Sequence, residues 1–173
     1  MSAGHTLLTI CAMMLLTTIL LNFYKLMANN SDTIAGGQDG ILQTTLATSY
    51  IERASGLAFD SVTDTSAVAI GLPSKLTLYN KLGPEAGAGE DSVYKFNDFD
   101  DFNNLIVEEQ ANGSTRTYKT TFKVSYVSPG NIETVLSTQS FTKRLDIKTW
   151  RTFPPGRTDT LKLSMVMGYF HFD

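Results

Sequence analysis

Hydrophobic and polar positions follow three successive patterns along this chain of 173 residues. From Met1 to Tyr24 there is no Lys, Arg, Asp or Glu, so a helix formed there is apolar on every face. Between Ile41 and Ala54 apolar residues recur every three or four positions, which is typical of a helix with one buried face. Beyond about residue 105 the period is two, as in half-buried strands. The patterns predict an α+β fold, in which a long N-terminal helix packs on a C-terminal antiparallel sheet.

The uncharged N-terminal segment is long enough to cross a membrane. As a helix, residues 1–24 extend about 36 Å, slightly more than the ~30 Å hydrocarbon core of a bilayer. A secretory signal peptide has a basic start and small residues at its cleavage site, and neither occurs here. A lipoprotein signal has a small residue before its cysteine, whereas bulky Ile10 precedes Cys11. These features favour a retained helix that anchors the chain or packs against copies of itself.

The helix is expected to continue for about fifty residues and to stop at Gly56. Its amides and glycines at 29–40 weaken the helical pattern, and the sequence leaves open whether this stretch is helical or melted. Beyond it we predict one buried stripe, formed by Ile41, Leu42, Thr45, Leu46, Ser49, Tyr50 and Ala54. The expected divisions are an apolar helix at 1–28, its amphipathic continuation at 29–56, and a β-rich head domain at 57–173.

The β-rich region reads as four or five short strands joined locally. Asn112-Gly113 predicts a tight hairpin, Pro129-Gly130 a second turn, and 153–156 a break before the last strand. We expect strands at 105–109, 116–126, 132–136, 141–150 and 160–172. Local connections of this kind predict an antiparallel meander, covered on its apolar face by the amphipathic half of the helix.

The composition of the chain argues against two classes of protein, those that bind nucleic acids and those held together by disulfides. With 42% hydrophobic and 18% charged residues and a net charge of −3, the chain is globular and not basic enough to indicate nucleic-acid binding. Its only cysteine, Cys11, lies in the apolar segment, so there is no disulfide framework. We interpret that thiol as a small apolar filler rather than a reactive group.

Candidate chemistry is sparse. Residues 97–104 contain three aspartates and three asparagines, the oxygen ligands that calcium prefers, but without the spacing of an EF-hand loop. We therefore expect a solvated acidic loop and no metal site. His5 and His171 lie at opposite ends of the chain, and no serine occupies a nucleophile-elbow motif. The sequence predicts no catalytic residues, no cofactor and no enzyme.

Two segments carry a family resemblance. Gly4-His5-Thr6-Leu7-Leu8-Thr9 resembles the Gly-Phe-Thr-Leu-Ile-Glu processing motif of type IV pilins and pseudopilins, and an apolar helix follows it. Residues 46–60, Leu-Ala-Thr-Ser-Tyr-Ile-Glu-Arg-Ala-Ser-Gly-Leu-Ala-Phe-Asp, resemble the end of that helix in minor pilins and pseudopilins. The resemblance covers about the first 60 residues. Beyond them, the expected β-rich region agrees with the family in architecture only.

The N-terminus departs from that family. Its members usually have a glutamate at the fifth mature position, which pairs with the terminal ammonium of a neighbouring subunit. Here Thr9 takes that place if cleavage follows Gly4, and His5 takes it if Met1 is the mature start. The basic leader of the family is also absent, which favours Met1, although the sequence leaves both starts open.

The resemblance implies a structural subunit of an extracellular, type IV pilus-like helical filament at the cell surface. Its implied partners are copies of itself, the cytoplasmic (inner) membrane before assembly, and the pilus assembly machinery; methylation is also implied. Two alternatives stay open: a pseudopilin or minor pilin of a secretion system, and a monomeric membrane-anchored binding module. The residues expected to mediate assembly or membrane contact are Met1, His5, Leu7, Leu8, Ile10, Met13, Leu15, Leu16, Ile19, Leu20 and Phe23.

Overall fold

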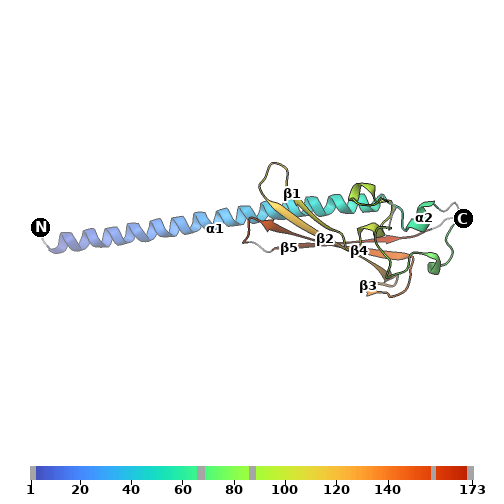
Figure 1. Cartoon of the computed structure of the whole chain (residues 1–173). Coiled ribbons are helices and arrows are strands. Elements are labelled where there is room, and N and C mark those ends of the chain that lie inside the picture. Colours follow the sequence, from blue (N-terminus) through green and yellow to red (C-terminus); the bar gives the residue numbers. More distant parts are fainter. Residues whose placement is uncertain (1–2, 66–68, 86–88, 157–158, 171–173) are drawn as a thin grey trace. The chain divides into compact units, whose positions relative to one another are not determined.

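A computed structural model describes residues 3–65, 69–85, 89–156 and 159–170. Its first element, α1, is a single helix of 53 residues, Ala3–Ser55, which ends one residue before the predicted stop at Gly56 (Figure 1). The stretch at 29–40 is helical throughout. Added Cβ atoms at Gly37 and Gly40 would meet nothing within 4 Å, so no close approach of another segment requires glycine there.

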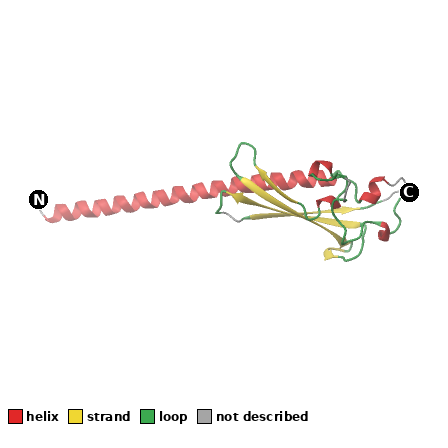
Figure 2. Ribbon diagram, in the orientation of Figure 1, coloured by secondary structure: helices red, strands yellow, loops and turns green. Residues whose placement is uncertain are grey.

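The chain divides into two compact units. The first extends to Ile41 and the second, here called the C-terminal unit, begins at Leu42. The boundary lies inside α1, so the last turns of that helix belong with the sheet. The predicted α+β architecture, with a long helix packed on an antiparallel sheet, is confirmed (Figure 2).

Five strands form the sheet, and the order along it is β1-β2-β4-β5, with β3 paired to β2. All pairings are antiparallel. The bounds are β1 Ile106–Gln110, β2 Thr117–Ser128, β3 Asn131–Val135, β4 Thr142–Phe153 and β5 Thr160–Gly168. Both predicted turns are confirmed, and the last residues assigned to the final strand, 171–172, lie outside the described part of the chain.

The meander prediction is wrong in one connection. β3 does not lie between β2 and β4, which instead pair directly along most of their length (Figure 1). Phe122 lies opposite Ile147, and Val124 opposite Leu145. All four are buried, so the long direct pairing covers more apolar surface than the short, fully exposed β3 can.

The last turns of α1 cover the apolar face of the sheet. Their buried side chains are Gln43, Ala47, Tyr50 and Ala54. The ring of Tyr50 meets that of Phe122 edge to face, with centroids 4.9 Å apart. The predicted stripe is thus wrong in part, because Ile41, Thr45 and Ser49 are exposed. Tyr50 and Ala54 are buried as predicted, whereas Gln43 and Ala47, which the stripe omitted, are buried as well.

Short elements join α1 to β1. They are the helix α2 (Ser61–Thr65) and the 3₁₀ helices η1 (Pro73–Lys75), η2 (Val93–Lys95) and η3 (Asp100–Phe102). Ala58 bonds to both flanks of the turn before η3: its N–H donates to the Asn97 carbonyl (3.2 Å) and its carbonyl accepts from the Phe99 N–H (2.9 Å). Asn103 anchors the other end, with its amide bonded to the Leu82 carbonyl and the Val124 N–H.

Candidate functional site

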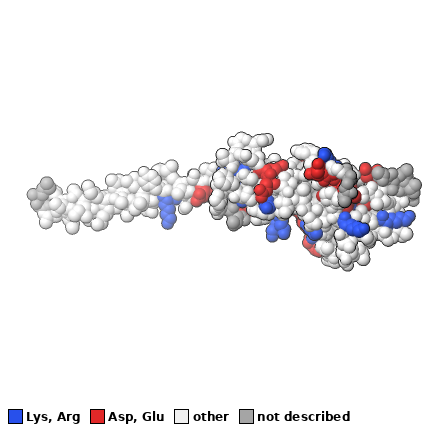
Figure 3. Space-filling model, viewed as in Figure 1, with Lys and Arg blue, Asp and Glu red and all other residues white. Residues whose placement is uncertain are grey.

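The first candidate site is the surface of α1 before Lys25. Nine of the predicted assembly residues are 47–71% exposed: Leu7, Leu8, Ile10, Met13, Leu15, Leu16, Ile19, Leu20 and Phe23. His5 is exposed as well, and Met1 lies outside the described residues. In Figure 3 this end of the helix carries neither acidic nor basic side chains. An apolar surface of this extent, on all sides of a helix, is unusual for a segment in water.

The threonine hydroxyls of this segment are satisfied within the helix. Four threonine hydroxyls donate to backbone carbonyls three or four residues earlier, at 2.8–2.9 Å: those of Thr6, Thr9, Thr17 and Thr18. Such internal hydrogen bonds reduce the cost of moving a hydroxyl into an apolar environment. By length and composition α1 is able to cross a membrane.

A second candidate site lies inside the C-terminal unit, where the acidic loop is buried. Asp98, Asp100 and Asp101 each have 0% exposure, so the prediction of a solvated loop is wrong. Phe96, Phe99 and Phe102 are the reason. At a spacing of three these rings face the core together. The aspartates between them are therefore buried in the same core.

One buried lysine neutralises part of this charge. Lys143, on β4, is fully buried, and its ammonium donates to the Phe59 carbonyl (2.7 Å), to Asp60 Oδ2 (2.9 Å) and to Asp100 Oδ1. Asp60 also accepts hydrogen bonds from the N–H and hydroxyl of Thr77. Burial alone would raise the pKa of Asp60, but the ammonium and these hydrogen bonds hold it below its usual value.

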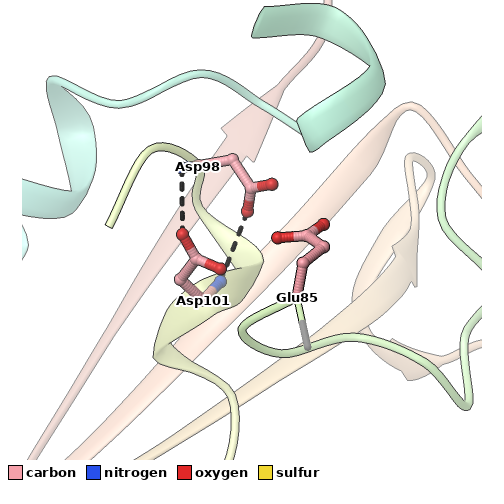
Figure 4. A group of neighbouring side chains, drawn as sticks. All are labelled: Glu85, Asp98 and Asp101. Carbon is pink, nitrogen blue, oxygen red and sulfur yellow. Dashed lines mark hydrogen bonds between the residues drawn. The ribbon is translucent and has the colours of Figure 1, made fainter. Parts of the chain in front are cut away.

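Three further carboxyl groups, Glu85, Asp98 and Asp101, are here called the carboxylate cluster. An oxygen of each lies within 4.8 Å of the others, and Figure 4 shows the three side chains converging from two segments of chain. Asp98 Oδ1 accepts from the N–H groups of Asp100 (2.8 Å) and Asp101 (3.3 Å). In return, Asp101 Oδ2 accepts from the N–H groups of Asn97 (3.0 Å) and Asp98 (3.2 Å).

The other oxygen of each aspartate has no such donor. Asp98 Oδ2, Asp101 Oδ1 and Glu85 Oε2 are buried and accept no hydrogen bond within the described part of the chain. Burial first, and the charges of Asp100 and Asp101 second, raise the pKa of Asp98 to about 9. Burial likewise raises the pKa of Asp101 above its ordinary value. Burial and the neighbouring charges therefore favour the protonated form of these carboxyl groups over the ionised form.

The sequence contained two signals that would have located this polar centre. In the alternation of β4, Lys143 has the same parity as Leu145 and Ile147, which places it on the buried face. The three-residue spacing of phenylalanines around Asp98 and Asp101 was the second. Glu85 gave no signal, because only the tertiary fold brings it to the cluster.

No family model, curated protein or solved structure matches the chain. The resemblance to type IV pilins and pseudopilins therefore stays a prediction from residues 4–9 and 46–60.

Proposed function

We propose that this protein is a structural subunit of an extracellular, type IV pilus-like filament. In this proposal the apolar part of α1 holds each subunit in the inner membrane, and the assembly machinery then transfers it into a bundle of the same helices. The observation that carries the proposal is the exposure, on every side, of the apolar residues before Lys25. Those residues require an apolar environment, and copies of the same helix provide one.

The energy available from such a bundle is large. Burial of roughly 1,500 Å² of apolar helix surface at about 25 cal/mol per Å² contributes about 37 kcal/mol before the costs of association. A polymer held by contacts of this size dissociates very slowly. The threonine hydroxyls are compatible with both the membrane and the helix bundle, because their hydrogen bonds are made within the helix.

Electron microscopy of material sheared from the cell surface tests the proposal. Long filaments that react with an antibody against the C-terminal unit are expected. A protein that stays with the membrane and is extracted by detergent only as a monomer contradicts the proposal. That outcome would support a membrane-anchored binding module instead. Short assemblies that stay at the envelope would support a pseudopilin or minor pilin.

A further inference from the structure

The carboxylate cluster combines burial, proximity and unpaired oxygens. Asp98 and Asp101 are fully buried, and each has one oxygen that accepts no hydrogen bond among the described residues. Glu85 contributes a third oxygen of this kind from a different loop. Like charges this close repel strongly where water is excluded. Such a group persists only if a cation or bound protons offset the repulsion.

Lys143 donates no hydrogen bond to this cluster. An ammonium group has three N–H donors, and those of Lys143 are directed at the Phe59 carbonyl, Asp60 and Asp100. No donor is left for Asp98, Asp101 or Glu85. The buried ammonium thus balances part of the acidic charge and leaves the carboxylate cluster outside its hydrogen bonds.

The geometry suits a calcium ion. Calcium binds oxygens at about 2.3–2.6 Å, so two ligands on opposite sides of one ion lie roughly 5 Å apart. The cluster oxygens, within 4.8 Å of one another, fit inside such a shell. Backbone N–H groups hold one oxygen of Asp98 and one of Asp101, so both carboxylates are oriented in advance.

We propose that Glu85, Asp98 and Asp101 form a calcium-binding site. Every ligand is a carboxylate oxygen, which suits a hard divalent cation rather than zinc or copper. Magnesium fits less well, because it requires near-ideal octahedral geometry and gives up its water reluctantly. The bound ion joins the loop at Glu85 to the turn that begins η3, and so stabilises the C-terminal unit.

Protonation is the competing explanation. The pKa of about 9 for Asp98 means that, without a cation, its carboxyl group keeps a proton at neutral pH and donates it to Asp100. A cluster that stays protonated does not bind calcium, whereas calcium binding would displace the proton. Calcium binding at neutral pH separates the two explanations.

The test uses the full chain in detergent, treated with a chelator and then titrated with calcium or magnesium chloride. Calorimetry should detect one calcium per chain. Saturating calcium should raise the melting temperature by roughly 5 °C or more. Magnesium should have a weaker effect at equal concentration. The proposal is overturned if millimolar calcium neither binds nor shifts the melting temperature, or if magnesium binds as tightly.

Asp98→Asn is the most informative variant. Its amide oxygen keeps the two backbone hydrogen bonds, and its NH₂ group donates to the neighbouring carboxylates. It should therefore melt no lower than the parent in chelator, yet lose the response to calcium. A variant that still binds calcium as the parent does would exclude Asp98 as a ligand.

Two other variants complete the test. Glu85→Gln should also lose the calcium response. If Asp98→Asn does not fold, Glu85→Gln alone tests the proposal. Asp91→Asn is the matched control, because Asp91 is an exposed acid paired with Lys95 and should respond like the parent. An unchanged calcium response in Glu85→Gln would show that Glu85 is not a ligand. Because binding is measured on subunits in detergent, the result does not depend on filament formation.

Discussion

Lys143 is the residue on which the polar interior of the C-terminal unit depends. Its ammonium is fully buried, lies 4.6 Å from the centre of the Phe59 ring, and bonds to two carboxylates and a carbonyl. Strand periodicity would have placed position 143 on the buried face, because Leu145 and Ile147 face the same way, but we did not draw that prediction from the sequence. The partners were not predictable, because Asp60 and Asp100 reach the lysine only through the tertiary fold.

Lys143→Met removes the charge and keeps most of the side-chain volume. Asp60 and Asp100 then stay buried without their counter-charge, and the free energy of unfolding should fall by about 3 kcal/mol or more. Urea denaturation followed by Trp150 fluorescence measures the loss. Lys95→Met is the control: Lys95 is an exposed lysine paired with Asp91, so a change within about 0.5 kcal/mol is expected. Equal effects in both variants would contradict the central role of Lys143.

His5 stands where the resembled family leads one to expect an acid, if Met1 is the mature start. As imidazolium it would repel a terminal ammonium, and as neutral imidazole it accepts one hydrogen bond at most. His5→Gln should therefore form filaments in nearly the parental amount, and His5→Glu should match or exceed it. Filament yield by sedimentation and microscopy checks this. Loss of filaments in both variants would reveal a specific role for His5.

At the scale of elements, α1 and the acidic turn illustrate what local sequence predicts. The helix, its end near Gly56 and the Asn112-Gly113 hairpin were predictable, because short-range spacing determines them. The three-residue spacing of Phe96, Phe99 and Phe102 was a local signal for the burial of the acidic turn, but it gave no sign of the hydrogen bonds that join Asn103 to Leu82 and Val124. These contacts join residues about twenty positions apart, beyond the range of any periodic pattern.

The apolar half of α1 allows a direct test of the filament proposal. Leu16→Asp places a carboxylate in the middle of the proposed bundle, where its burial costs several kcal/mol. Filaments should be lost, while the circular dichroism and melting of the C-terminal unit stay as in the parent. Leu16→Met keeps the apolar character and most of the volume, and should assemble normally. Normal filaments from Leu16→Asp would rule out the bundle.

At the scale of the whole molecule, the two units differ in what stabilises them. The C-terminal unit has its own core of aromatic and aliphatic residues, which joins the last turns of α1 to the sheet. The helix before Ile41 has no comparable core, and its apolar side chains are exposed. In the proposed filament, stability of the fold and association between subunits would therefore belong to different parts of the chain.

Removal of residues 1–29 should separate these two properties. The remaining chain keeps the core of the C-terminal unit and should melt cooperatively, within a few degrees of the full chain in detergent. Without the apolar segment it should be monomeric in water, as measured by analytical ultracentrifugation. A shortened chain that aggregates, or that lacks a cooperative transition, would show that the first unit is needed for folding.

The ion pair of Asp60 with Lys143 joins residues 83 positions apart in the sequence. A ribosome therefore releases Asp60 and the acidic turn well before it has made their cationic partner. Until β4 emerges, these aspartates stay in water, because burial without the ammonium is costly. The nascent chain consequently gains its final interior only late in synthesis. A chain that stops short of residue 143 should remain open to proteases, however much of α1 has already formed.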